Sequence, residues 1–395
     1  MKKERNYYIY LIILCLIFFC MMFFSYEDPY ENLILVITLL LSIKLKNNIK
    51  NQKVLSISKI IFIIIIAYSL SLLFLSMKAY DIDKNIDISS VSNRTKAVLL
   101  VYEGEAARYE LKKEMRNLIL RKDLTDIIIS PFKLYKKRRL YDILGKSDYK
   151  KKTEYIYNQI NDSIKDEYKV YLGYLYDEKY IEEEILKIVK DGYEDIIVVP
   201  VFLSNINNLN DLHNRVSSLK LYNNNIKIKY TEPLWSSESI LQSYLNLIKN
   251  NTNANNKNNI GLNLIGIGEK NFNKSENINS VKQNIIFRTK MKNKLISNLN
   301  FEDSKIKLSW YNYLEPNYIS ESNELLEYGI SELICIVVDP QLKEIINIDV
   351  YNELNDEINF PDGVKCKILN GFISDKNIVN ELINRIKYID MQNWN

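Results

Sequence analysis

The sequence predicts an α/β protein in which two lobes, each built on a parallel sheet, are preceded by two or three transmembrane helices. Three observations lead to this fold class. Uncharged apolar runs lie near the N-terminus. After Lys96, short runs rich in β-branched residues alternate with amphipathic stretches, which is typical of βα units. A polar, Asn-rich segment at 250–259 divides this alternation into two halves, which predicts two lobes.

The first part of the chain, residues 1–90, is predicted to be a membrane anchor. The runs Tyr7–Ser25 and Ile60–Met77 contain no charged side chain, and each is about as long as a helix that crosses a bilayer. They predict spans at about 7–25 and 58–77. Because no small-residue cleavage motif follows the first run, we expect an uncleaved anchor rather than a signal peptide. The protein is therefore expected in the cell membrane as a multi-pass protein, with the lipid bilayer as a partner.

A third apolar segment, at about 31–46, decides the topology. Its apolar part is shorter than a full span, and it crosses the bilayer only if Lys44 and Lys46 extend toward the headgroups. With three spans every Lys-rich flank lies inside, as the positive-inside rule requires, and the large domain is extracytoplasmic. With two spans the domain is cytoplasmic. The sequence favours three spans, and both topologies stay open.

The rest of the chain is predicted to form an N-lobe at 91–250, a linker at 251–259 and a C-lobe at 260–395. Alternating strands and helices form parallel sheets that helices cover on both faces, as in Rossmann-like folds, and a ligand is expected at the carboxyl ends of the strands. The predicted strands are Ala97–Tyr102, Lys169–Tyr174, Ile196–Phe202, Ile226–Tyr230, Ile260–Ile265, Lys305–Trp310, Leu333–Val338 and Lys365–Leu369. The predicted helices are Tyr149–Ile164, Glu178–Lys190, Ser236–Lys249, Val281–Leu299, Ser320–Tyr328, Gln341–Glu353 and Lys376–Tyr388.

The composition excludes several classes of protein. The chain of 395 residues carries 53 Lys and Arg against 49 Asp and Glu, and this near-neutral balance lacks the basic surface of a nucleic-acid-binding protein. A single histidine rules out a metal site built from several histidines, and we predict no resident metal. The four cysteines form no C-x-x-C motif, so neither a zinc knuckle nor a disulfide framework is expected.

In each lobe, one turn follows the first strand, at the place where an α/β protein usually binds its ligand. The first turn is YEGE at residues 102–105, and the second is GIGE at residues 266–269. Neither fits the G-x-G-x-x-G motif of dinucleotide-binding proteins or the P-loop, which also needs Lys and Ser or Thr. The turns therefore mark a candidate site without predicting a nucleotide.

Three other features can be interpreted either as ordinary parts of the fold or as functional residues. His213 lies early in a predicted helix, where a partly exposed side chain is more common than a ligand. Cys335 lies within an apolar strand and is interpreted as a buried, inert thiol. The basic run at 133–139 is interpreted as a solvated helix face, and the alternative is contact with anionic lipid or with the carboxylates of a ligand.

Five segments, in order along the chain, are similar to elements of one enzyme family. They are Ala97–Tyr102, Tyr141–Ser147, the βα unit Lys169–Gly192, Tyr313–Pro316 and Ile345–Val350. Through them the chain from Lys96 to Tyr388 resembles ferrochelatase, the enzyme of the class II chelatase superfamily that inserts a metal into protoporphyrin. The resemblance implies chelatase-like lobes with a porphyrin, haem or other tetrapyrrole between them, and a divalent metal as a second ligand. It implies no further cofactor.

The sequence departs from this family at the residues that perform metal insertion. In the family a histidine follows the first strand of the second lobe and takes protons from the porphyrin nitrogens or contacts the metal, whereas Ile267 stands here. The family's partner glutamate corresponds to Lys343, whose ammonium would repel an incoming divalent ion. Glu103, Glu105, Glu269 and Glu344 are the carboxylates that could substitute for the missing base.

The resemblance also implies ligand-binding residues. Tyr102 and Ser147 match positions that contact porphyrin in the family. His213 falls near a Tyr-bearing segment of the family and is the third candidate. These three residues form the predicted binding site.

Three functions follow from these expectations. Because the usual insertion residues are missing, the favoured function is a membrane-anchored, ferrochelatase-like protein that binds a tetrapyrrole or metal-tetrapyrrole in the cleft without inserting a metal. The alternative is a divergent metal chelatase, a lyase, that inserts a divalent metal into a porphyrin with a substitute carboxylate. The third is a membrane-tethered interaction domain without catalysis.

Overall fold

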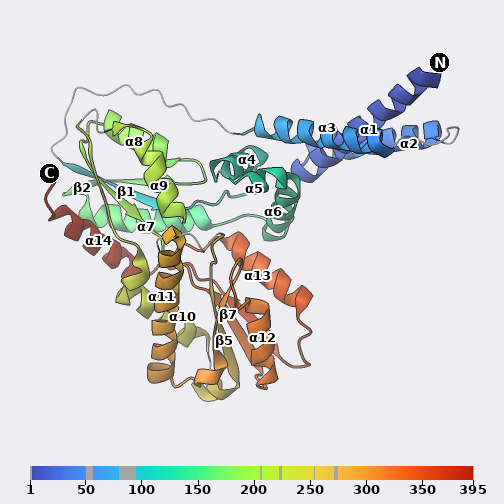
Figure 1. Cartoon of the computed structure of the whole chain (residues 1–395). Coiled ribbons are helices and arrows are strands. Elements are labelled where there is room, and N and C mark those ends of the chain that lie inside the picture. Colours follow the sequence, from blue (N-terminus) through green and yellow to red (C-terminus); the bar gives the residue numbers. More distant parts are fainter. Residues whose placement is uncertain are drawn as a thin grey trace. The chain divides into compact units, whose positions relative to one another are not determined.

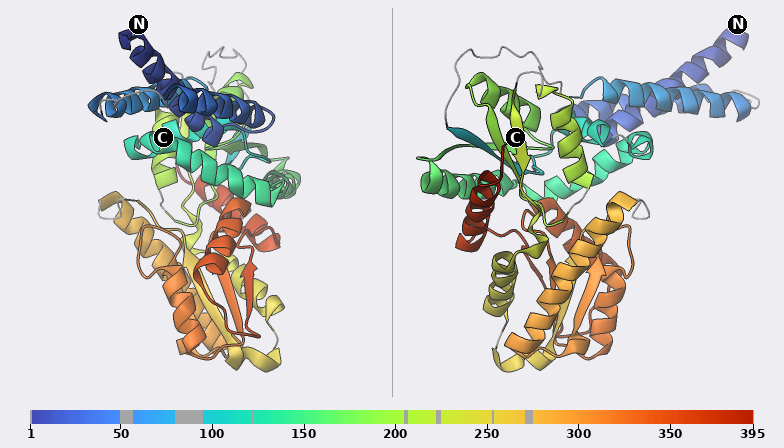
Figure 2. Two further views of the ribbon diagram at one scale, coloured as in Figure 1. Left: turned by 90° about the vertical axis from the view of Figure 1, so that its right-hand side faces the viewer. Right: turned by 60° about the vertical axis from the view of Figure 1, so that its left-hand side comes forward.

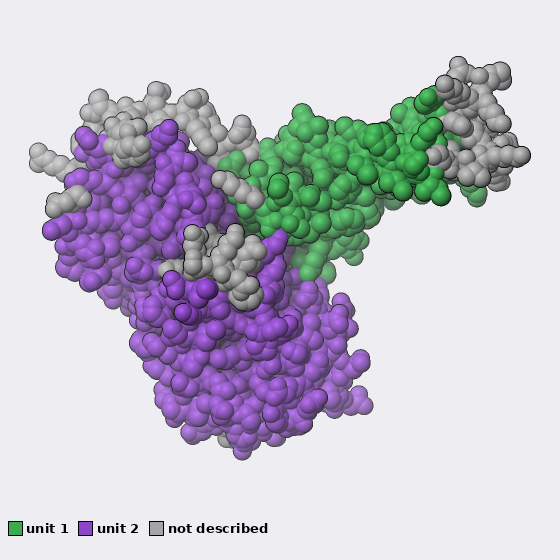
Figure 3. Space-filling view, in the orientation of Figure 1, with its two compact units in different colours: residues 1–82, 106–146 green, residues 83–105, 147–395 purple. Residues whose placement is uncertain are grey.

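The helices and strands follow one another along the chain as shown in Figures 1 and 2. The computed structural model describes residues 2–49, 57–79, 95–121, 123–204, 207–221, 225–252, 254–270 and 275–394. The chain divides into two compact units (Figure 3). Unit 1 consists of Met1–Ile82 and Ala106–Lys146, and unit 2 consists of Asp83–Glu105 and Ser147–Asn395. The chain therefore leaves unit 2 after Glu105 and enters it again at Ser147.

Among the first three helices of unit 1, the first packs against both the second and the third (Figure 1). They are α1 (Lys2–Ser25), α2 (Tyr30–Ile49) and α3 (Ile57–Ser76). Among the described residues, Tyr7–Ser25 of α1 and the whole of α3 are long and apolar enough to cross a membrane. Helix α2 carries Glu31 and two lysines and is not in this group. The number of spans, and with it the side of the large domain, stays a prediction.

Three further helices complete unit 1, namely α4 (Leu111–Leu120), α5 (Leu124–Ile128) and α6 (Ser130–Leu144). The Asp123 side chain caps the N-terminus of α5 by accepting hydrogen bonds from backbone N–H groups of the first turn. A proline stands in the first turn of α6, where a helix tolerates the missing N–H. Helix α4 packs against α3, and α6 packs against α1. The N-lobe expected at 91–250 is thus interrupted by a segment that packs on the apolar helices.

Arg138 fixes α6 to the end of α1. The residue is 4% exposed, and Nη1 donates to the backbone oxygen of Phe23 at 3.0 Å and to that of Tyr26. Its Nη2 forms an ion pair with the Glu31 carboxylate at 3.0 Å. The expectation of a solvated face for the whole run 133–139 is therefore wrong for Arg138. The reason is that the last turn of a helix leaves carbonyl groups without helical partners, and this guanidinium satisfies two of them.

The first lobe of unit 2 is a four-stranded parallel sheet with the strand order β2-β1-β3-β4. Its strands are β1 (Lys96–Tyr102), β2 (Tyr168–Tyr174), β3 (Asp195–Pro200) and β4 (Lys227–Tyr230). Its helices are α7 (Tyr149–Ile164), α8 (Ile181–Lys190), α9 (Asn207–Ser217) and α10 (Glu238–Asn251), with a 3₁₀ turn at Leu234–Ser236. The central strands β1 and β3 are almost wholly buried, which is why they appear in the sequence as continuous apolar runs.

The second lobe repeats this arrangement with the strand order β6-β5-β7-β8, again all parallel. Its strands are β5 (Ile260–Gly266), β6 (Ile306–Trp310), β7 (Glu332–Val337) and β8 (Lys365–Leu369). Its helices are α11 (Ser275–Leu299), α12 (Tyr318–Glu327), α13 (Glu344–Glu357) and α14 (Lys376–Asp390), with a 3₁₀ turn at Asp303–Lys305. The predicted α/β class with two parallel sheets is confirmed, and the predicted strands and helices are present with ends that differ by a few residues.

The segment expected as a linker, 251–259, is partly helical. Helix α10 continues to Asn251, and Ala254–Asn259 forms a 3₁₀ helix. This polar segment is tied to the second lobe, because Lys257 donates to the backbone oxygen of Leu299 at 2.7 Å. The backbone N–H of Ser331 likewise donates to the backbone oxygen of Asn259 at 2.8 Å.

The last helix, α14, joins the two lobes of unit 2. It follows β8 in the chain but packs against α7 and β3 of the first lobe. Asp390 near its end accepts a hydrogen bond from the Tyr168 hydroxyl at 2.9 Å and forms an ion pair with Lys96. Buried side chains of both sheets belong to one continuous hydrophobic cluster, so the two lobes share a core.

Candidate functional site

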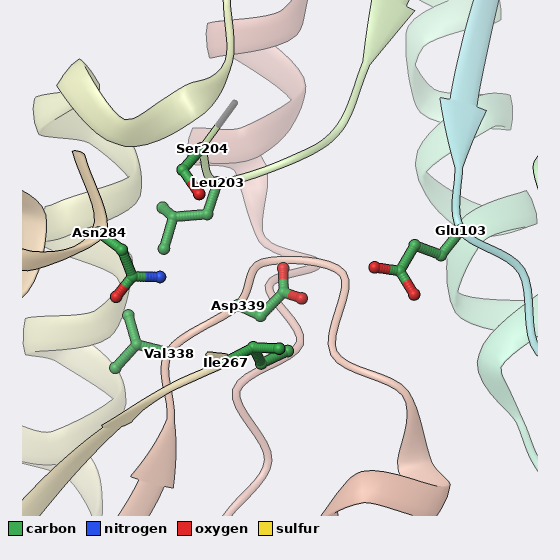
Figure 4. Close-up of a pocket in the computed structure, with 7 residues that line it drawn as sticks. All are labelled: Glu103, Leu203, Ser204, Ile267, Asn284, Val338 and Asp339. Atoms are coloured by element: carbon green, nitrogen blue, oxygen red, sulfur yellow. The ribbon is translucent and has the colours of Figure 1, made fainter. Parts of the chain in front are cut away.

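A small, partly open pocket lies at the carboxyl ends of the central strands of both sheets (Figure 4); its empty space of about 300 Å³ includes open solvent. This is where α/β proteins usually bind their ligands. The lining residues are Glu103 after β1, Leu203 and Ser204 after β3, Ile267 after β5, Asn284 on α11, and Val338 and Asp339 after β7. The pocket is therefore the candidate site.

Asp339 is the buried acid of the pocket. It is 8% exposed, and Oδ1 accepts a hydrogen bond from the backbone N–H of Gln341 at 3.2 Å. Burial raises the pKa of Asp339 to about 7; the nearby Glu103 carboxylate adds to the rise, while the Lys343 ammonium opposes it. In Figure 4 the carboxylates of Glu103 and Asp339 approach each other from opposite sides of the pocket. A carboxyl group with a pKa near 7 can accept and release a proton at neutral pH.

Glu103 is held by two side chains. Its carboxylate forms an ion pair with Lys343 and accepts a hydrogen bond from Nδ2 of Asn208. Its backbone N–H donates to Oε1 of Gln341 at 2.8 Å. The side chains of Glu103 and Lys343 are 13% and 14% exposed, so solvent screens this ion pair only in part. The positive charge of Lys343 is therefore compensated within the wall of the pocket.

A chain of hydroxyl groups leads from the pocket to Glu269. Ser204 lies on the pocket wall, and its Oγ is 3.2 Å from Oγ of Ser280. The Ser280 hydroxyl donates to Oε1 of Glu269 at 2.7 Å. All three side chains are buried. Because a hydroxyl donates and accepts at the same time, this chain can pass a proton from the pocket to the Glu269 carboxylate.

Close packing explains the two glycines of the second turn. A Cβ atom at Gly268 would lie 1.8 Å from the backbone oxygen of Asn312. A Cβ atom at Gly266 would lie 2.7 Å from Cζ of Arg288. The G-x-G spacing beside Ile267 therefore allows neighbouring segments to approach the turn closely.

The change Gly268→Ala is expected to lower the free energy of unfolding by about 3 kcal/mol, because the new methyl group meets backbone atoms rather than a movable side chain. Gly363→Ala is the matched control. Gly363 has open space around it and a φ of +86°, so its replacement costs only the strain of that backbone conformation, about 1 kcal/mol. Denaturant unfolding of the full chain in detergent, followed by circular dichroism, measures both variants. Equal midpoints would contradict the packing role of Gly268.

Ser147 and Glu344 belong to a network that joins the two lobes. The Ser147 hydroxyl donates to the Glu105 carboxylate at 3.0 Å. The same carboxylate accepts hydrogen bonds from the backbone N–H groups of Glu344 and Ile345, at 2.8 and 2.9 Å, at the start of α13. The Glu344 carboxylate in turn accepts from the backbone N–H of Asp148 at 2.9 Å. Glu105 and Glu344 thus bind backbone donors of the opposite lobe.

Tyr102 and His213 are not among the residues that line the pocket. Tyr102 is fully buried in the core, and its hydroxyl has no hydrogen-bond partner within the described part of the chain. His213 lies on α9 with its ring edge-on to Tyr230, at 4.3 Å between centroids. Burial lowers the pKa of His213. The predicted porphyrin contacts Tyr102, Ser147 and His213 are therefore not brought together at one surface, and their role stays a prediction.

Some of the remaining predicted residues line the pocket or are connected to it, and others do not. Ile267 and Glu103 line the pocket, and Lys343 is connected to it by an ion pair with Glu103. Glu269 connects to the pocket through two hydroxyl groups. Glu344 does not line the pocket. Of the four substitute carboxylates, Glu103 alone is a lining residue.

Sequence reasoning missed Asp339, Ser204 and Asn284. Asp339 directly follows a predicted apolar strand, and a carboxylate at that place is a signal that could have found it. Ser204 and Asn284 carry no comparable signal. Across the described residues, no group of three or more His, Cys, Asp or Glu side chains is arranged to hold a metal ion.

One protein family matches part of this chain. The CbiX family matches residues 145–251, which include α7 to α10 and the strands between them. The matched segment is less than half of the chain. No curated protein sequence matches the chain.

Solved structures are also similar to it, among them the following three. SirB from Bacillus subtilis with Fe³⁺ is 16% identical with a TM-score of 0.49, covering 75% of this chain and 96% of SirB. The sirohydrochlorin chelatase SirB from Bacillus subtilis subspecies spizizenii in complex with cobalt is 14% identical with a TM-score of 0.46, covering 75% and 95%. DR2241 from Deinococcus radiodurans, a multi-domain protein with structural similarity to chelatases, is 11% identical with a TM-score of 0.42, covering 76% and 55%. Since all three TM-scores are below 0.5, membership of the whole chain in the chelatase superfamily stays a prediction.

Proposed function

We propose that this protein is a membrane-anchored metal chelatase that acts on a tetrapyrrole in the pocket at the ends of the central strands. The observation that carries the proposal is the pair of facing carboxylates, Glu103 and Asp339, of which Asp339 has a pKa of about 7. The similarity of residues 145–251 to the CbiX family supports it, as does the resemblance to the class II chelatase superfamily. In this proposal α1 and α3 are the anchor.

The chemistry requires a base. Insertion of a divalent ion into a tetrapyrrole forms bonds from the ring nitrogens to the metal and releases the protons of two pyrrole N–H groups. The Asp339 carboxylate accepts one of these protons. Ser204 and Ser280 pass the other to Glu269. A positioned base of this kind contributes about 10²–10⁴-fold to a rate.

The charges of the pocket favour a cation once Asp339 has lost its proton. Glu103 and Lys343 cancel each other, so the ionised Asp339 leaves the pocket with one net negative charge. Partial burial makes this attraction stronger than it would be in water. The lysine at the place of the family's glutamate therefore does not prevent a divalent ion from approaching.

The second candidate function is binding of a tetrapyrrole or metal-tetrapyrrole without insertion. Two observations favour it. Ile267 lines the pocket where the family has its histidine. The Glu103 carboxylate is already held by Lys343 and Asn208, and a metal would have to compete with both.

One experiment separates these candidates. The full chain in lipid nanodiscs is titrated with sirohydrochlorin and with protoporphyrin while the Soret band is followed, and Co²⁺, Fe²⁺ or Zn²⁺ is then added. The chelatase proposal predicts a Soret shift on binding, and then metal insertion faster than in protein-free nanodiscs. Binding without accelerated insertion would leave the second candidate. No Soret change with either tetrapyrrole would contradict both candidates and favour a tethered interaction domain.

A further inference from the structure

Helices α5 and α6 expose a row of large apolar side chains. Leu124 is 75% exposed, Ile128 is 53% exposed and Phe132 is 55% exposed. Ile129 and Tyr135 are exposed as well, at 38% and 36%. These five residues, the apolar row, follow one another at short helical spacings. A contiguous exposed apolar patch on a protein marks an interaction surface.

The apolar row is continuous with the helices that can cross a membrane. The Phe24 ring, one residue before the end of α1, lies 5.3 Å from the Tyr135 ring and 6.2 Å from the Phe132 ring, measured between centroids. The hydroxyl of Tyr68 on α3 donates to the backbone oxygen of Ile128. If α1 crosses the bilayer over Tyr7–Ser25, its final turn lies at the boundary between lipid and water. The contacts with Phe24 then place the apolar row at that boundary.

Basic side chains accompany the apolar row on α6. The Arg139 side chain is 60% exposed and forms an ion pair with Asp142. The Lys133 and Lys137 side chains are 35% and 36% exposed, and they form ion pairs with Asp126 and Glu114. Lys136, four residues after Phe132, is also exposed. Apolar side chains next to lysine and arginine are typical of helices that lie in the headgroup region of an anionic bilayer.

We propose that α5 and α6 lie in the headgroup region of the bilayer, with the apolar row inserted toward the acyl chains. The inference rests on the membrane anchor of the proposed function and adds a second contact with the lipid. The segment that contains α5 and α6 begins directly after Glu105 and ends directly before Ser147. These two residues are hydrogen-bonded to each other, and Glu105 lies two residues after Glu103 of the pocket. The lipid-bound segment is therefore connected by the chain to both of them.

Three tryptophan variants of the full chain test this proposal in nanodiscs of phosphatidylcholine and phosphatidylglycerol that contain brominated acyl chains. Phe132→Trp reports on the apolar row, and Leu11→Trp reports on α1, where Leu11 is 56% exposed. Tyr351→Trp on α13, which is 48% exposed at the wild-type tyrosine, is the water-exposed control. The chain has three native tryptophans, and the emission of the parent protein is subtracted.

The expected result is that the Phe132→Trp reporter loses about half of its emission when bromine lies close to the headgroups, and less when it lies deep in the bilayer. The Leu11→Trp reporter should be quenched by deep bromine, and the Tyr351→Trp reporter by neither. Quenching at Leu11→Trp without quenching at Phe132→Trp would overturn the interfacial position of α5 and α6 and leave the anchor intact. Absence of quenching at both would overturn the anchor as well.

Discussion

Asp339→Asn is expected to slow metal insertion by about 10²–10⁴-fold, because the amide cannot accept the proton that the carboxylate accepts. Binding of the tetrapyrrole should change little, since asparagine has nearly the same volume. Asp362→Asn, at an exposed position in the loop before β8, is the matched control and should insert metal at the parent rate. The measurement is the initial rate of the Soret change after metal is added to the preformed tetrapyrrole complex. An Asp339→Asn rate equal to that of the parent would exclude Asp339 as the base.

The pH dependence identifies the same group independently. The parent rate should rise with pH and level off above about 7, because the ionised form of Asp339 is the one that accepts a proton. The residual rate of Asp339→Asn should show no such rise. Lys343→Met should move the midpoint to higher pH, since the Lys343 ammonium lowers the pKa of Asp339. A midpoint that stays in place in this variant would contradict the electrostatic link.

The melting temperature of Asp339→Asn shows whether the variant is slow because it lacks the base or because its fold is destabilised. The pKa of Asp339 rises from 3.8 to about 7 in the folded protein, so its favourable contribution to folding is complete below pH 3.8 and is lost as the pH rises toward 7. Above pH 7 the ionised, buried carboxylate costs stability. Asp339→Asn is therefore expected to melt at a higher temperature than the parent at pH 8, with no such gain at pH 4. An inactive variant that melts lower at pH 8 would contradict this account.

Glu105→Ala is expected to lower the free energy of unfolding by about 3 kcal/mol, because it removes a buried acceptor of three hydrogen bonds. The substitution is expected to destabilise the first turn of α13 most, because the backbone N–H groups of Glu344 and Ile345 lose their hydrogen-bond acceptor. Hydrogen exchange of peptides that cover these two residues should become faster, alongside a lower melting temperature of the full chain.

Two variants control this experiment. Glu105→Gln keeps one acceptor oxygen in place and should cost less than Glu105→Ala. Glu357→Ala, at the exposed last residue of α13, should leave both the melting temperature and the exchange at the start of the helix unchanged. If Glu105→Ala exchanges at the parent rate in the first turn of α13, the network does not join the lobes as described.

The fold could be predicted because the central strands are buried on both faces. Strands such as β1 and β7 contain almost only apolar residues, and the helices between strands show an apolar face. Helix starts were less predictable, since α11 begins at Ser275 in a polar stretch rather than at Val281. The position of Ala106–Lys146 in unit 1 could not be predicted. It depends on contacts such as that of Arg138 with Glu31, more than a hundred residues apart.

The candidate site could be predicted only in part. Glu103 and Ile267 were found because each directly follows a strand, and the ends of parallel strands meet at one edge of a sheet. The sequence could not distinguish them from Glu105 and Glu344, which bind backbone donors of the opposite lobe. The local sequence does not show whether a carboxylate faces a pocket or caps a helix.

The repeated strand order has a consequence for the symmetry of the pocket. In the two sheets, β1 corresponds to β5 and β3 corresponds to β7. Two identical chains joined as a dimer would place the same side chain after both members of each pair. One continuous chain is free of this restriction, and here Glu103 follows β1 whereas Ile267 follows β5. The pocket therefore differs in chemistry from one half to the other, and a tetrapyrrole bound there as proposed would meet a carboxylate on one side and a hydrocarbon on the other.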